Sequence, residues 1–218
     1  MHYRMRDGLS WCVSEGRAVF LDLESDRYFR LGLEDDRAFQ TWVQSGEANM
    51  LDPAGLVRAG VLVPCSDPHP LLAMTQVTMP LADVAEEAGT RARIVDIMHG
   101  LVAQRQAARA IRRGALAKLV GGIRTGRTPP PTCDPEATVR RIAAAFASTP
   151  LSFRKSGQCL PRALAAHAMC RRSGVVPTLV FGVRVAPFAA HCWLQFGSHI
   201  VVGDLEQARM FTPILAVP

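Results

Sequence analysis

The part of the chain that most constrains the fold is a helical pattern followed by three apolar runs near the C-terminal end. The helical pattern spans about Gln158 to Arg172 and stops before Gly174. The apolar runs that follow have the length and content of buried strands and cover Pro177–Val185, His191–Phe196 and His199–Asp204. A helix that precedes a group of strands predicts an α+β fold for this region.

The N-terminal region has the pattern of a small antiparallel sheet followed by helices. Three short strands separated by short turns are expected at Leu9–Ser14, Arg17–Leu23 and Tyr28–Leu31. A helical period with Phe39 and Trp42 on one face follows, and a second short helix ends at Gly60. We therefore expect a separate N-terminal domain over residues 1–75.

The middle of the chain, residues 76–132, has the pattern of long helices and is expected to be a helical connector. Its last part, Thr125–Thr132, is too rich in proline for a regular element and is expected to be a linker or exposed loop. Asp134-Pro135 then begins a new helix, because Asp is a good N-cap and Pro suits the first helical turn. Residues 133–218 are expected to form the core of the second domain.

The charge balance of the chain invites a nucleic-acid function but does not favour it. The formal net charge is +6, and part of the excess lies in a basic stretch that contains Arg105, Arg109, Arg112, Arg113, Lys118, Arg124 and Arg127. This stretch has no interleaved aromatic residues on which bases could stack. A solvated helix face, or a surface for an acidic peptide or protein, explains it better than nucleic acid.

The cysteine content and the N-terminal residues predict a soluble, cytoplasmic protein. The six cysteines form no CxxC pair, and the first residues, MHYRMRDGLS, lack the apolar run of a secretory signal. No segment approaches the roughly 20 apolar residues of a membrane-spanning helix. We expect neither a membrane nor a nucleic acid as a partner.

Cys159 is the candidate nucleophile. It begins the helical pattern CLPRALAAHAMC, and Pro161 suits a first helical turn. The unpaired N–H groups and partial positive charge at a helix N-terminus favour a thiolate, so the position fits a reactive cysteine. A small buried apolar residue is the alternative interpretation of Cys159.

His191 and Asp204 are the candidate base and its orienting residue. If Gly197-Ser198 forms a two-residue turn, Phe196 pairs with His199, and the same register puts His191 opposite Asp204. Opposed side chains in an antiparallel pair lie on one face, close enough for a carboxylate to hydrogen-bond an imidazole. The three residues would then form a Cys-His-Asp triad, although one bulge in the hairpin would change the register.

A metal or a nucleotide is not expected in this chain. His167 and Cys170 are three residues apart on one helix, but a structural zinc site needs four ligands and no second pair has a compatible spacing. No GxxxxGK[ST] or GxGxxG motif occurs. The sequence therefore predicts chemistry without a metal or cofactor.

The C-terminal part of the chain resembles the transglutaminase-like leader peptidases of lasso-peptide biosynthesis, the B proteins. The resemblance covers about residues 135 to 218 and includes SGQCLPRALA, AAHCWLQF, VVGD and FTPIL. Cys192 stands where such proteins more often have Ala, and Gly203 where Asn is common. The resemblance implies a transglutaminase-like or papain-like fold and a cysteine peptidase that cuts a leader peptide from a precursor. It is compatible with the backbone N–H of Cys159, and with Gln158, as oxyanion donors.

The N-terminal part resembles, more weakly, the small winged-helix recognition element of these enzymes. The resemblance implies that a leader peptide adds as a strand to a sheet edge. The expected docking residues are Tyr28, Phe29, Arg30 and Leu31, although ordinary sheet packing explains Phe29 and Leu31 equally well. The implied partners are the precursor peptide and an ATP-dependent cyclase of the asparagine-synthetase type.

Two other functions are compatible with the sequence. A transglutaminase-like acyltransferase could use the same triad, because only the acceptor differs between an amine and water. A peptide-binding or DNA-binding regulator could be built on the N-terminal domain without any catalysis.

Overall fold

The structure of the chain is a computed structural model. It describes residues 2–45, 53–67, 74–88, 91–127, 130, 134–149 and 157–218. The chain divides into two compact units, Met1–Thr75 and Gln76–Pro218. Residues 76–132, expected as a connector, thus belong to one unit with residues 133–218.

The N-terminal unit contains five strands and two helices in its described residues. In chain order these are β1 (His2–Met5), β2 (Leu9–Ser14), β3 (Arg17–Asp22), β4 (Arg27–Arg30), α1 (Leu33–Ser45), α2 (Ala54–Arg58) and β5 (Leu62–Cys65). Strands β2, β3 and β4 form an antiparallel sheet in that order, and β1 pairs with β5 in a second sheet. The three strands expected from the sequence are present, and β1, which was not expected, forms because a partner 60 residues away pairs with it.

The turn between β2 and β3 has the local signal that a tight hairpin needs. Glu15 and Gly16 form a two-residue loop with φ values of 51° and 73°, and Ser14 pairs with Arg17 on either side of it. Positive φ at both positions is the type I′ turn, whose twist matches that of paired strands.

An aromatic cluster forms the core of the N-terminal unit. Phe39 of α1 contacts the Trp11 ring edge-on at 5.0 Å and the Phe20 ring at 4.9 Å, and Phe29 of β4 stacks on Phe20 at 5.1 Å. The alternation along β2, β3 and β4 thus directs their aromatic residues toward α1. The winged-helix form expected for this unit stays a prediction.

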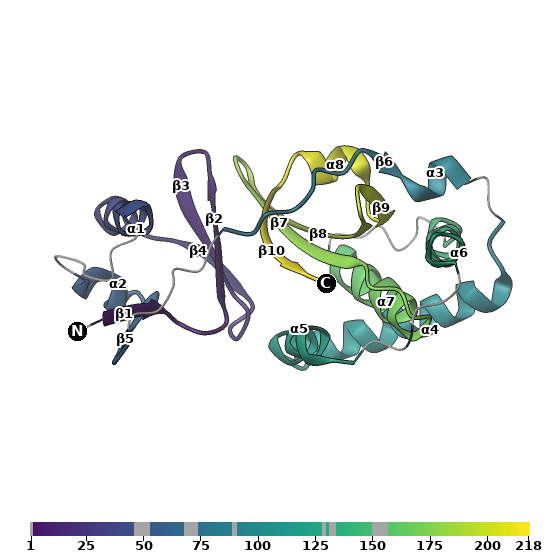
Figure 1. Cartoon of the computed structure of the whole chain (residues 1–218), viewed down its shortest axis with the longest axis horizontal. Coiled ribbons are helices and arrows are strands. Elements are labelled where there is room, and N and C mark those ends of the chain that lie inside the picture. The colour runs from purple at the N-terminus through teal and green to yellow at the C-terminus, as the bar shows by residue number, and fades with distance from the viewer. Residues whose placement is uncertain are drawn as a thin grey trace. The chain divides into compact units, whose positions relative to one another are not determined.

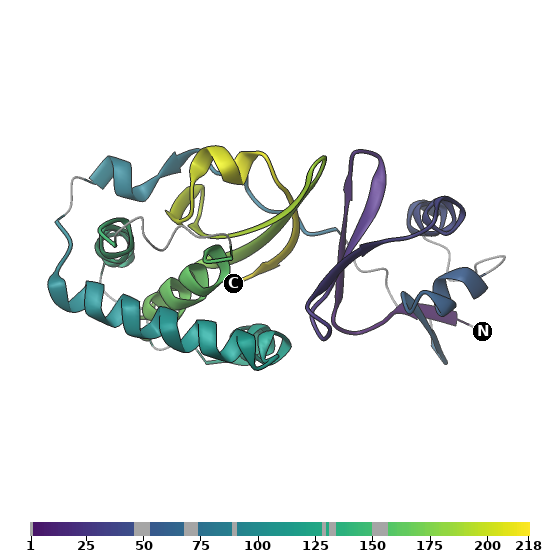
Figure 2. The same cartoon turned by 180° about the vertical axis from the view of Figure 1, so that it is seen from behind.

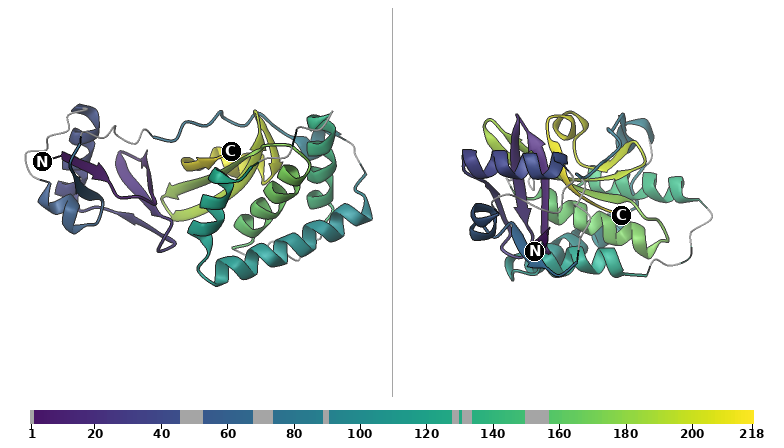
Figure 3. Two further views of the ribbon diagram at one scale, coloured as in Figure 1. Left: turned by 60° about the horizontal axis from the view of Figure 1, so that its bottom comes forward. Right: turned by 60° about the vertical axis from the view of Figure 1, so that its left-hand side comes forward.

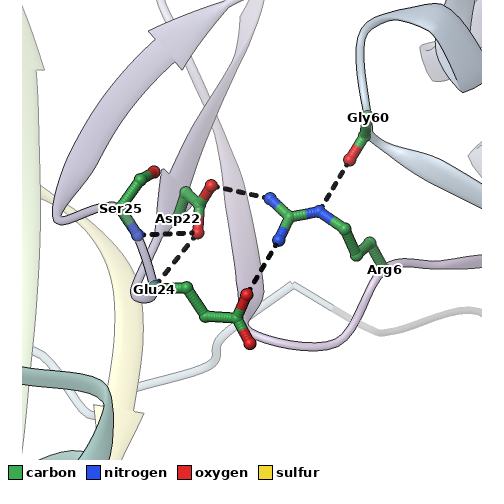
Figure 4. A network of polar contacts seen from close by, with 5 residues as sticks. All are labelled: Arg6, Asp22, Glu24, Ser25 and Gly60. Carbon is green, nitrogen blue, oxygen red and sulfur yellow. Dashed lines mark hydrogen bonds and ion pairs between the residues drawn. The ribbon is translucent and has the colours of Figure 1, made fainter.

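A partly exposed polar network ties together the turns of the N-terminal unit (Figure 4). Arg6 donates to Asp22 at 2.6 Å, to Glu24 at 3.5 Å and to the carbonyl oxygen of Gly60 at 3.0 Å. Burial favours a higher pKa for Asp22, but hydrogen bonds from Ser25 and Arg6 outweigh it and hold the pKa of this carboxyl below its usual value. Arg6 therefore attaches the segment between β1 and β2 to the turn between β3 and β4.

The C-terminal unit is a sheet with helices on both faces. Its elements are β6 (Ala82–Asp83), α3 (Val84–Ala88), α4 (Ile94–Arg112), α5 (Leu116–Thr125), α6 (Pro135–Ala147), α7 (Cys159–Arg172), β7 (Thr178–Val185), β8 (Phe188–Phe196), β9 (His199–Val202), α8 (Leu205–Arg209) and β10 (Thr212–Val217). The strand order is β10-β7-β8-β9-β6, antiparallel except for β6 beside β9. Helix α7 lies against one face and α8 against the other (Figure 1).

Helices α6 and α7 of the C-terminal unit begin where the sequence signals predict. Asp134 caps α6 by accepting a hydrogen bond from the backbone N–H of Ala137 at 2.8 Å, with Pro135 in the first turn. Helix α7 begins at Cys159 and is followed by Gly174 with a φ of 77°. The expected linker Thr125–Thr132 lies partly outside the described residues.

Four elements of this unit were not expected from the sequence: β6, α3, α8 and β10. Strand β10 contains a proline, Pro213. In the structure Pro213 lies beside a shift in the pairing of β10 with β7, at the edge of the sheet. Proline is tolerated at such a position because no ladder donor is needed there.

Candidate active site

Cys159 is the first residue of α7. Its neighbour Gln158 is the N-cap residue and makes no side-chain cap hydrogen bond. Pro161, two positions after Cys159, is buried. The Cys159 side chain is half-buried. The residues immediately before, 150–156, lie outside the described part of the chain. A thiol at this place meets the unpaired backbone N–H groups of a helix start.

His191 lies in β8 and is held between aromatic rings. Its ring stacks on Trp193 with 6.1 Å between centroids and lies 5.3 Å from the ring of Phe211. Its Nε2 is buried and has no hydrogen-bond partner among the residues that the structure describes. Burial lowers the pKa of His191, and the negative charge of Asp204 partly opposes this effect. The imidazole is therefore neutral near pH 7, the form that can accept a proton.

Asp204 is the N-cap residue of α8. Its Oδ1 accepts a hydrogen bond from the backbone N–H of Gln207 at 2.9 Å, and the side chain is exposed. Its effect on the pKa of His191 shows that the carboxylate and the imidazole are within electrostatic range of each other. The carboxylate of Asp204 thus caps α8 through Gln207 and also interacts electrostatically with His191 of β8.

The hairpin register that we expected for His191 and Asp204 is wrong. Phe196 pairs with His199 as expected, and Gly197 has the positive φ, 58°, of a first turn position. Beyond Gln195, however, the pairing shifts by one residue, because Val201 is an extra residue in β9. Strand β9 then ends at Val202, so Asp204 approaches His191 from the start of α8 and not as a cross-strand partner.

The structure links Cys159 electrostatically to Cys192, the residue next to His191. Burial raises the pKa of Cys192 well above its usual value, and the negative charge that Cys159 can carry raises it further. Cys192 pairs with Phe181 while His191 pairs with Gly182, so the two neighbours point to opposite faces of the sheet. A hydrogen bond from the Cys159 thiol to His191 Nε2 is not formed.

Gln158 has a side-chain partner that the sequence did not reveal. Gln104 of α4 donates from Nε2 to Gln158 Oε1 at 3.2 Å. Gln104 is buried, and within the described part of the chain its own Oε1 has no hydrogen-bond partner. The only sequence signal was a polar residue on the apolar side of a helix, next to Ala103. The hydrogen bond occupies the carbonyl oxygen of the Gln158 amide, and the NH₂ group of this amide takes no part in it.

His167 and Cys170 lie in the buried part of α7. Burial, with a smaller effect from Arg171, lowers the pKa of His167 to about 4, and burial raises the pKa of Cys170 to about 12. Among the residues that the structure describes, no three His, Cys, Asp or Glu side chains gather where they could hold a metal ion. In the same part of the chain, no helix is long and apolar enough to cross a membrane.

The four expected docking residues lie at the end of β4 and just after it. Strand β4 pairs with β3 on one side, and no strand of the described residues pairs with its other side. Phe29 packs on Phe20, while Leu31 is buried and its carbonyl oxygen accepts a hydrogen bond from Arg17 at 2.7 Å. Arg30 is exposed and Tyr28 half-buried. Two of the four side chains therefore serve the core, and β4 is an outer strand of its sheet among the described strands.

The C-terminal unit places Cys159 at the start of a buried helix, α7, and His191 on β8, a strand that this helix packs against. Residues 100–216 match the family model of the transglutaminase-like superfamily. Because the match covers more than half of the chain, the chain belongs to this superfamily, whose fold is typical of cysteine peptidases and acyltransferases. No curated protein and no solved structure matches the chain.

Proposed function

We propose that the chain is a cysteine peptidase that cleaves the leader from a ribosomally made lasso precursor peptide. Cys159 is the nucleophile, His191 the general base, and Asp204 the residue that orients the imidazole and stabilises its protonated form during the reaction. The observation that carries the proposal is the position of Cys159 at the start of α7 in a transglutaminase-like domain. The electrostatic link of His191 to Asp204 supports the roles of the other two residues.

The reaction proceeds through a thioester. The Cys159 sulfur attacks the carbonyl carbon of the bond between leader and core, and His191 takes the thiol proton. His191 then gives a proton to the leaving amine of the core, and the C–N bond breaks. Water, deprotonated by His191, hydrolyses the thioester, so the leader leaves as a carboxylic acid and Cys159 is regenerated. The step requires His191 Nε2 and the Cys159 thiol, which form no hydrogen bond with each other, to come together.

The oxyanion of the tetrahedral intermediate would be stabilised at the start of α7. The backbone N–H of Cys159 is one donor, and the NH₂ group of Gln158 is the second. The hydrogen bond from Gln104 supports this role, because it occupies the Gln158 carbonyl oxygen and leaves the amide donor available. A donor fixed before the reaction costs little reorganisation in the transition state.

The N-terminal unit would hold the leader. A leader that pairs with the open edge of β4 gains main-chain hydrogen bonds and extends the β2-β3-β4 sheet by one strand. Tethering the precursor in this way raises the effective concentration of the scissile bond at Cys159. The released core, with a free amine, would pass to an ATP-dependent cyclase of the asparagine-synthetase type.

The decisive experiment incubates the full chain with a precursor peptide in water labelled with heavy oxygen and weighs the products. Incorporation of the label into the leader carboxylate supports hydrolysis. Cys159→Ala and His191→Ala should abolish the product, while Cys65→Ala and His199→Ala, which alter the same residue types elsewhere, should retain it. Full activity in Cys159→Ala would overturn the proposal.

The same experiment tests the acyltransferase function. The superfamily supports this second candidate equally well, since attack by an amine on the thioester differs from hydrolysis only in the acceptor. Adding a primary amine and finding a leader amide in place of the acid would favour transfer. If leader binding occurs but neither product forms with the wild-type chain and its partners, the binding-only function is favoured.

A further inference from the structure

We propose that one exposed face of α4 is a docking surface for an acidic, amphipathic helix of a partner protein. The α4 face consists of Ile94, Val95, Met98, Val102, Arg105, Arg109 and Arg112. Apart from Val95, which flanks the others, these residues follow one another at spacings of three or four, so they form one stripe along the helix. The proposal does not depend on the peptidase function.

The first half of the α4 face is apolar and open to solvent. The exposed fractions are 78% for Ile94, 63% for Val95, 55% for Met98 and 47% for Val102. Single exposed apolar residues are ordinary, but a contiguous exposed apolar group on one helix face is typical of an interaction site. These four side chains lie within about two turns of each other.

The second half of the α4 face is basic. Arg105, Arg109 and Arg112 are exposed, and no ion pair joins them to an acidic side chain in the described part of the chain. Residues 94–127 contain seven basic residues and one acidic residue, Asp96, a net charge of +6. The whole chain also has a net charge of +6. The excess positive charge of the protein is therefore concentrated in this segment.

The opposite face of α4 is committed to the interior of the C-terminal unit. Gly100 lies so close to α6 and α7 that a Cβ on it would be 3.4 Å from the Phe146 ring and 3.9 Å from the sulfur of Met169. Asp96 is buried beside Arg141, with 2.5 Å between Oδ1 and Nη1. Figures 2 and 3 show α4 along the margin of this unit, with α7 on its inner side. The exposed face is thus presented by a helix that is itself firmly held.

The pattern of the α4 face selects a protein helix over nucleic acid or lipid. The phosphate backbone of a nucleic acid has no apolar groups that could contact the apolar half of the α4 face. Residues 94–127 also contain no aromatic side chain to stack on a base. Arg112 lies at the same angle around the helix as Ile94, so a membrane that received Ile94 would also receive Arg112 at the same depth. A second copy of the chain would bring like charges together. A helix with apolar residues in one half and acidic residues in the other matches both halves.

The test measures binding of a synthetic helical peptide to the full chain by fluorescence anisotropy. The probe has leucines along one stripe of its first half and glutamates along the same stripe of its second half. A control peptide of the same composition has leucines and glutamates alternating along the stripe. We expect the segregated peptide to bind at least roughly tenfold more tightly than the alternating one, with an affinity that falls as salt rises.

Two groups of variants of the α4 face, one for its arginines and one for its apolar residues, separate its halves. Binding should weaken in a triple variant with Arg105→Glu, Arg109→Glu and Arg112→Glu, and in the milder triple variant with Gln at these three positions. It should also weaken in a double variant with Met98→Ser and Val102→Ser. A matched control reverses three exposed arginines elsewhere: Arg37→Glu, Arg58→Glu and Arg172→Glu. Circular dichroism verifies that each variant is folded.

Four outcomes would overturn the docking proposal. They are equal binding of the two peptides, an equal loss in the arginine control, no loss in the serine variant, and tighter α4-dependent binding of anionic phosphatidylglycerol vesicles or a DNA duplex than of the segregated peptide. Loss of affinity in both α4 variants but not in the control supports it. Cleavage of a precursor peptide is measured separately, so the docking surface and the peptidase function can fail independently.

Discussion

Gly182 and His191 are directly opposed across β7 and β8. A Cβ on Gly182 would lie 2.7 Å from the indole ring of Trp193 and 2.9 Å from Cβ of Phe211. These are the two aromatic residues that hold the imidazole. The absence of a side chain at position 182 therefore allows the aromatic rings around His191 to close.

Gly182→Ala is expected to displace Trp193 and Phe211 and to lower both stability and turnover. Overpacking of this kind costs about 1–3 kcal/mol of unfolding free energy, and a His191 ring that has lost its support reaches the thiol less often. Urea unfolding and single-turnover cleavage measure the two effects. The control is Gly121→Ala in α5, where a Cβ would meet nothing within 4 Å, so activity should be unchanged. Unaltered activity in Gly182→Ala would contradict the role given to the aromatic rings.

Asp204→Asn is expected to lower turnover with little loss of stability. Asn can still accept the hydrogen bond from Gln207 that caps α8, but it lacks the negative charge that raises the pKa of His191. The pKa of His191 should therefore fall further, which histidine NMR titration would show. Leader affinity should stay nearly constant, because the proposed leader site is in the other unit. Asp204→Ala removes the cap as well and should cost about 1 kcal/mol more. An unchanged His191 titration in Asp204→Asn would contradict the electrostatic link.

His167 is expected to make the C-terminal unit sensitive to acid. Its pKa is about 4 in the folded chain, against an ordinary value of 6.5, so between these values the unfolded chain binds more protons than the folded one. Stability from this group is thus complete above pH 6.5 and is lost as the pH falls toward 4. The loss is roughly 3 kcal/mol, since each pKa unit corresponds to about 1.4 kcal/mol.

His167→Leu should flatten the pH dependence of the unfolding free energy between pH 6.5 and 4. Urea unfolding of the variant and of the wild type across that range measures the difference. His99→Leu, which changes an exposed histidine of α4, serves as the control and should keep the wild-type slope. The same slope in all three proteins would show that His167 is not protonated in this range.

Prolines in β4 should separate leader binding from folding. Backbone N–H groups of successive strand residues point alternately toward β3 and toward the open edge, so Phe29→Pro and Arg30→Pro remove donors on opposite sides. The proline on the open side should weaken leader binding while the unit keeps its melting temperature. The other should lower the melting temperature through loss of β3 pairing. Phe29→Leu controls for the ring contact with Phe20. Wild-type leader affinity in both proline variants would move the docking site away from β4.

The sequence by itself determined the elements whose signals are local. Asp134 and Pro135 begin α6, Glu15 and Gly16 form the β2–β3 turn, and the pattern from Cys159 to Arg172 defines α7. In each case a few adjacent residues satisfy their own backbone or bury one face, so no distant partner has to be known. Cys159 could be chosen as the candidate nucleophile for the same reason, from its place at a helix start, whereas His191 and Asp204 were chosen from a hairpin register that differs from the observed one.

Only the tertiary structure decided the elements and contacts that need a distant partner. Strand β1 exists because β5 pairs with it, and Gln104 reaches Gln158 across 54 positions of sequence. The extra residue Val201 shifts the β8–β9 register and makes Asp204 a helix cap beside His191, not its cross-strand partner. Register and side-chain pairing depend on which surfaces are buried together. That information is distributed over the whole unit, and a single segment does not contain it.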